Sequence, residues 1–78
     1  MSPVALELDC RGLRCPLPVI ELARRVGDVA VGEVVAVVAT DPAARHDVPA
    51  WCRMRGHAYR GEDEAEDGVP RFSVERLA

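Results

Sequence analysis

The sequence predicts an α+β fold, a two-layer α/β sandwich with the order βαβαββ, in which two helices pack on one face of a four-stranded mixed sheet. Three features support this prediction: a segment that alternates apolar and polar residues, two segments with apolar residues at helical spacing, and a β-branched run between them. With 78 residues the chain suffices for one small domain, spanning residues 1–78. A chain of this size offers no deep enzyme pocket.

The first two elements are predicted from a change in the spacing of apolar residues, from every second position to every third or fourth. A strand is expected at Val4–Asp9, where Val4, Leu6 and Leu8 alternate with polar residues and would face the core. A helix is expected from Pro16 to about Val26, because its apolar residues recur every three or four positions.

The middle of the chain predicts a central strand and a second helix. Val34–Ala39 is β-branched and apolar on both faces, which is typical of a strand covered on both sides. Asp41-Pro42 and Asp47-Val48-Pro49 are helix-start signals, so a helix should run from about Arg45 to Arg55. Gly56 should end it.

The last third of the chain predicts a hairpin. Strands are expected at His57–Glu62 and Arg71–Leu77, with Phe72 and Val74 inward, joined by the acidic turn Asp63–Gly68. Right-handed crossovers after the first two strands would place both helices on the same face of the sheet.

Composition narrows the classes of function. The net charge is -3 and no segment concentrates arginine without nearby acids, which argues against direct nucleic-acid binding. All ten basic residues are arginine, so Schiff-base chemistry on a lysine is excluded. Neither a secretory signal after Met1 nor an apolar run of membrane-spanning length is visible, so we expect a cytoplasmic protein with free thiols and no membrane association.

Cys15 is the candidate reactive residue. It stands where the first helix should begin, so the positive end of the helix dipole should lower the pKa of its thiol. Arg11 and Arg14 should add positive charge. Pro16 and Pro18 should make the frame rigid, so that the sulfur is presented outward in one geometry.

A thiolate placed in this way has a defined chemistry. It would attack a persulfide on a donor, hold the terminal sulfur as Cys-S-SH and pass it to an acceptor, without a metal or a cofactor. The alternative is a cysteine that only caps the helix.

Several motifs in register resemble the TusA/SirA-like sulfur carriers, and the match covers almost the whole chain. They are Leu8-Asp9-x-x-Gly12-Leu13-x-Cys15-Pro16-x-Pro18, Gly32-Glu33 before the apolar strand, Asp41-Pro42-Ala43, and Asp47-Val48-Pro49-x-x-Cys52.

The resemblance implies the βαβαββ fold and a persulfide on the residue that matches the family's cysteine, Cys15. It implies a cysteine desulfurase or rhodanese as donor and an acceptor protein in tRNA thiolation, molybdenum-cofactor assembly or sulfur oxidation. The expected partner contacts are Arg11, Gly12, Leu13, Arg14, Pro16, Leu17, Pro18, Asp41, Arg45 and His46. His46 departs from the family, because relatives often carry arginine directly before the aspartate that matches Asp47.

Other hypotheses use the same residues. Cys10 is either a small half-buried residue or a resolving thiol that attacks a persulfide on Cys15. A zinc site formed by Cys10, Cys15, His46 and Cys52 is disfavoured, because no C-x-x-C is present. Cys52 should lie on the inward stripe of the second helix. The alternative function is a regulatory interaction module or a thiol redox sensor that uses the same loop.

Overall fold

The structure is a computed structural model that describes residues 3–78. Its elements in order are β1 (Val4–Cys10), α1 (Leu17–Arg25), the short 3-10 helix η1 (Val26–Asp28), β2 (Val34–Ala39), α2 (Ala44–Arg55), β3 (Ala58–Glu64) and β4 (Pro70–Glu75). The predicted domain also takes in residues 1–2, which lie outside the described part.

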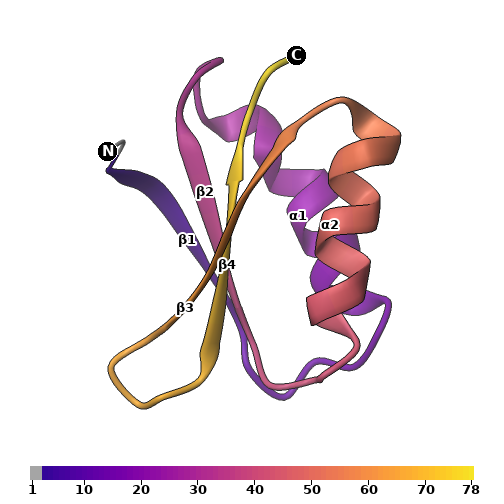
Figure 1. The fold of residues 1–78 in the computed structure, drawn as a ribbon, viewed down its shortest axis with the longest axis vertical. Helices are drawn as coiled ribbons and strands as arrows, with labels where there is room; N and C mark the ends of the chain where they lie inside the picture. Colours follow the sequence, from indigo (N-terminus) through magenta and orange to yellow (C-terminus); the bar gives the residue numbers. More distant parts are fainter. Residues whose placement is uncertain (1–2) are drawn as a thin grey trace.

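The four strands form one sheet in the order β1-β2-β4-β3. β1 pairs with β2 in parallel, whereas β4 is antiparallel to both β2 and β3. Figure 1 shows both helices on the same face of this twisted sheet, as right-handed crossovers require. The predicted fold class is therefore confirmed.

β2 is the centre of the molecule, because all six of its residues are buried. Val35, Val37 and Ala39 belong to the core between sheet and helices, together with Phe72 and Val74 of β4. The prediction of a central strand and of an inward-facing hairpin pair is confirmed.

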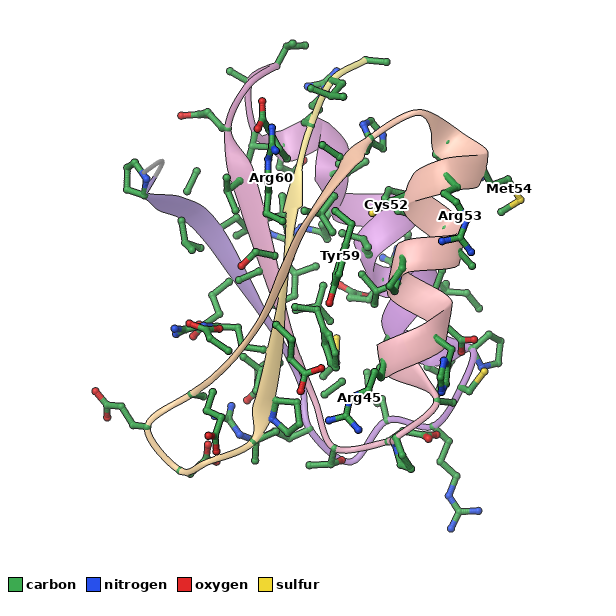
Figure 2. All side chains as sticks on the ribbon, in the orientation of Figure 1. Arg45, Cys52, Arg53, Met54, Tyr59 and Arg60 are labelled. Atoms are coloured by element: carbon green, nitrogen blue, oxygen red, sulfur yellow. The ribbon has the colours of Figure 1, made fainter. Side chains whose placement is uncertain are left out.

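The second helix buries the side expected from its sequence. Val48, Trp51 and Cys52 are buried, and Figure 2 shows Cys52 on the inner side of α2. Met54 points away from the body of the molecule and is 74% exposed.

Some predicted details are wrong. Val4 was expected in the core but is 44% exposed, because it begins an edge strand whose register shifts before Leu6. α1 begins at Leu17 rather than Pro16, and the chain tightens into η1 after Arg25. The last strand ends at Glu75, two residues earlier than expected.

The parallel pairing of β1 and β2 decides which loops meet. The carboxyl ends of parallel strands lie at the same edge of a sheet, so the loop at 11–16 lies beside the loop at 40–43 (Figure 1). The β3–β4 turn reaches the same edge, where Arg11 Nε donates to Asp67 Oδ2 at 2.8 Å. Within residues 3–78, neither helix has the length and apolar character needed to cross a bilayer.

His57 joins the end of α2 to the C-terminal segment. Its Nδ1 accepts a hydrogen bond from the backbone N–H of Leu77 at 3.1 Å, and its ring stacks on Trp51 with centroids 5.2 Å apart. Burial lowers the pKa of His57, and the charges of Arg76 and Arg55 lower it further. The folded protein therefore holds this imidazole neutral more strongly than the unfolded chain does.

We expect His57 to make stability depend on pH. The unfolded chain takes up the proton near pH 6.5, before the folded state does, so the contribution of His57 to the free energy of unfolding should fall as pH drops below that value and become constant below the folded pKa. Urea denaturation at a series of pH values measures this. His57→Gln should flatten the decline and the matched control His46→Gln should retain it; an equal decline in His57→Gln and wild type would contradict the assignment.

Candidate functional site

The three cysteines differ in their access to solvent. Cys15 is exposed, whereas Cys10 and Cys52 have exposed fractions of 0% and 1%. Burial, with the charges of Glu21 and Asp9, raises the pKa of the Cys10 thiol, and burial raises the pKa of Cys52 to about 11. Cys10 is the last residue of β1 and more deeply buried than expected, which removes the support for a resolving role.

The backbone around Cys15 is fixed by a tight turn and by the neighbouring loop. Gly12 adopts a φ of +79°, which favours glycine, and Leu13 N donates to the carbonyl of Cys10 at 3.1 Å. Gly12 N donates to Thr40 Oγ1 at 2.9 Å, across to the loop that follows β2. The segment that carries the cysteine is therefore an ordered turn.

Asp41 connects this turn to the start of α2. Its Oδ2 accepts a hydrogen bond from the backbone N–H of Cys15 at 2.8 Å, and its Oδ1 accepts one from Ala43 N at 2.9 Å. The N–H of Cys15, and to a smaller extent that of Ala43, holds the pKa of the Asp41 carboxyl below its usual range. One side chain thus positions both the cysteine backbone and the approach to α2.

A second carboxylate contacts the sulfur itself. Cys15 Sγ–H donates to Oδ2 of Asp47, in the first turn of α2, at 2.7 Å. This hydrogen bond raises the pKa of the Cys15 thiol, as do some loss of hydration and the charges of Asp47 and Asp41. The prediction that the thiol pKa is lowered is therefore wrong.

The dipole of α1 does not lower the pKa of the Cys15 thiol, for two reasons. Cys15 lies before the N-cap Pro16, and the first amides are already used: Leu17 N donates to the Arg14 carbonyl at 2.7 Å, and Val19 N donates to that of Pro16. The dipole is also equivalent to about half a charge at the helix end, whereas a carboxylate in direct contact carries a full one.

The predicted arginines do not supply positive charge to the sulfur. The guanidinium of Arg11 binds Asp67 in the hairpin turn and Asp9 at the end of β1. Its charge is therefore paired with these carboxylates and is not directed at Cys15. The charge of Arg14, an exposed residue, helps to lower the pKa of Asp41.

The two α2 residues predicted as partner contacts lie on the surface. Arg45 donates two hydrogen bonds to Glu62 at 2.9 and 2.8 Å, so its charge is paired with β3 (Figure 2). His46 is exposed and directly precedes Asp47.

The apolar residues beside Cys15 divide between surface and core. Pro16 is exposed, and Leu17 and Ile20 are 46% and 47% exposed. Pro18 is fully buried, so the prediction of a partner contact there is wrong; it packs α1 onto the rest of the molecule. Leu13 is half-buried against the core.

Two hollows on the surface of residues 3–78 bear on where the site lies. The smaller, of about 330 Å³, adjoins the cysteine turn, and its lining is Gly12, Leu13, Arg14, Thr40, Asp41 and Pro42. The larger, of about 760 Å³, lies on the sheet face away from the helices, where Arg60 pairs with Glu75 and Arg71 with Asp63. Because its charges are paired and its described lining includes no thiol or imidazole, we place the candidate site at the cysteine turn.

Sequence reasoning missed the roles of Thr40 and Asp47. Both follow the carboxyl end of β2, which parallel pairing places beside the carboxyl end of β1. The sequence contained this signal, but it was not used: Asp47 was interpreted as a helix-start residue and as part of the family motif, and Thr40 was given no role.

Fold and site together define a class: small two-layer α/β domains that expose a cysteine in the turn between the first strand and the first helix. The sequence model of the family described as sulfurtransferase TusA matches residues 6–76, and the chain belongs to this family of sulfur carriers. The predicted resemblance is therefore confirmed.

Individual relatives agree. The chain is 46% identical over 71 residues to the sulfur carrier protein TusA of Pseudomonas entomophila, which covers 91% of this chain and 88% of that one. It is 38% identical over 76 residues to YrkF of Bacillus subtilis, covering 97% of this chain but only 40% of that longer protein. The crystal structure of a SirA-like protein from Desulfitobacterium hafniense has the same fold, with a TM-score of 0.77 at 22% identity over 94% of this chain and 99% of that one.

Asp41 should contribute measurably to stability. Asp41→Ala removes both side-chain acceptors of the connection, so we expect the free energy of unfolding to fall. Asp41→Asn, which keeps one acceptor oxygen, should lose less. Urea denaturation of the three proteins measures the difference; an Asp41→Ala variant as stable as wild type would contradict the role.

Proposed function

We propose that this chain accepts sulfane sulfur as a persulfide on Cys15 from a cysteine desulfurase or a rhodanese-type donor and passes it to an acceptor protein. The observation that carries the proposal is that Cys15 is exposed while the other two cysteines are buried. Membership in the TusA family supports it independently.

The proposed transfer balances without a cofactor. The Cys15 thiolate attacks the terminal sulfur of the donor persulfide; a bond forms between Sγ and that sulfur, and the sulfur–sulfur bond of the donor breaks. The donor cysteine leaves as a thiolate and takes up the proton that Cys15 released. Handing the sulfur to the acceptor is the same exchange with the acceptor thiolate as nucleophile.

The surface around Cys15 suits contact with a second protein. Leu17 and Ile20 offer exposed apolar area on α1, and the hollow beside the turn offers polar groups from Arg14 and Asp41. Partner contacts through these residues and through Arg11, Gly12, Pro16, Arg45 and His46 are part of the proposal. The acceptor would belong to tRNA thiolation, molybdenum-cofactor assembly or sulfur oxidation.

The redox-sensor alternative receives less support. A sensor of the common type condenses an oxidised cysteine with a second accessible thiol. Cys10 and Cys52 are both buried, so neither supplies one.

Mass spectrometry tests the proposal. After incubation with a cysteine desulfurase and cysteine, without reductant, the peptide that contains Cys15 should be heavier by one sulfur atom. Cys10→Ala should load equally, whereas Cys15→Ser should not load and should unfold as wild type does, since an exposed serine replaces an exposed cysteine. Absence of the adduct on Cys15, or its presence only on another cysteine, would overturn the proposal.

A further inference from the structure

The contact between Cys15 and Asp47 constrains where the thiol proton resides. Sγ and Oδ2 lie 2.7 Å apart, and two anions at this separation would repel each other strongly. A proton between the two atoms removes this repulsion. Carboxylates are weaker bases than thiolates by about four to five pK units, so that proton belongs on sulfur.

The other charged groups around the sulfur do not reverse this preference. Asp41, from the loop after β2, adds a second negative charge. From the cysteine turn, Arg11 is bound to Asp67 and Asp9, and the charge of Arg14 acts on Asp41. On α2, Arg45 is bound to Glu62 and the neighbouring His46 is exposed.

We propose that Asp47 is a positioning residue that holds the Cys15 thiol protonated and weakly nucleophilic in the free protein, so that the sulfur is accessible but not reactive until this carboxylate is neutralised or drawn away. The proposal rests on the proposed function only in taking Cys15 as the transfer site.

The opposite role would be a general base. A general base works best when its pKa lies near the working pH and when it removes the proton in the transition state. Here the hydrogen bond stabilises the protonated sulfur, which opposes formation of the thiolate. The two roles predict opposite effects of removing the carboxylate.

The hydrogen bond between Cys15 and Asp47 can form when Cys15 is a free thiol but not when it carries a persulfide. A persulfide carries sulfur on Sγ in place of hydrogen, so Sγ no longer has a proton to donate to Asp47. Loading therefore removes the hydrogen bond that restrains the empty thiol.

The pH profile of Cys15 alkylation by iodoacetamide, followed by mass spectrometry, tests the proposal. Asp47→Asn keeps an acceptor oxygen for the thiol but removes the charge, so the midpoint of its profile should move to lower pH. A tenfold gain in thiolate is partly offset by lower nucleophilicity, so we expect alkylation at neutral pH to be about threefold faster or more.

The control is Glu33→Gln, which makes the same charge change just before β2, at the opposite end of that strand, and should leave the profile unchanged. Asp47→Glu, which restores the charge, should move it back toward wild type. A slower or unshifted reaction in Asp47→Asn would overturn the proposal, and a slower one would indicate a general base.

A second test compares wild type with a short reference peptide. Its alkylation midpoint should lie above that of a short unstructured peptide with the sequence Arg14-Cys15-Pro16-Leu17-Pro18. The dicationic disulfide cystamine should also oxidise wild type faster than the neutral hydroxyethyl disulfide, and Asp47→Asn should reduce this preference. A midpoint below the peptide's would overturn the proposal.

These measurements use no sulfur donor, so their outcome does not depend on whether the proposed function is correct. A shifted profile without persulfide formation would leave the role of Asp47 standing and remove the carrier assignment. Persulfide formation with an unshifted profile would support the carrier assignment and remove the proposed role of Asp47.

Discussion

The site depends on the pairing of two parallel strands. Because β1 and β2 run in the same direction, the turn that carries Cys15 and the loop that leads into α2 meet at one edge of the sheet. Asp41 then joins them through the backbone N–H groups of Cys15 and Ala43. Without this pairing, Asp47 would not contact the sulfur, since it is 32 residues further along the chain.

Two electrostatic effects compete at Cys15, and proximity decides between them. A helix start favours a thiolate, but its partial charge is spread over amides that are here bonded to the carbonyls of Arg14 and Pro16. The carboxylate of Asp47 touches the sulfur with a full charge. The result is a thiol that solvent reaches but that retains its proton, which suits a carrier that should react only with the proteins that dock on it.

The fold was predictable because local patterns and the handedness rule agree. The apolar run of β2 and the crossover rule together place both helices on one face. Strand and helix ends were less certain, because they depend on tertiary contacts: the chain leaves β4 after Glu75, yet Arg76 N still donates to the Glu33 carbonyl.

The cysteine was predictable from its motif, but its electrostatics were not. Local sequence places Cys15 beside arginines and a helix start, whereas the groups that determine its proton come from the segment after β2. Arg11 is near Cys15 in sequence, yet it binds Asp67 across the molecule. Pro18 belongs to the same motif but lies in the core.

Direct titration of the Cys15 thiol in the free protein, followed by the ¹³C chemical shift of its Cβ, tests the central claim most directly. The account predicts that the sulfur is still protonated where an unstructured cysteine peptide has already ionised. A thiol that ionises at lower pH than the peptide would contradict it and would restore the helix start as the dominant influence.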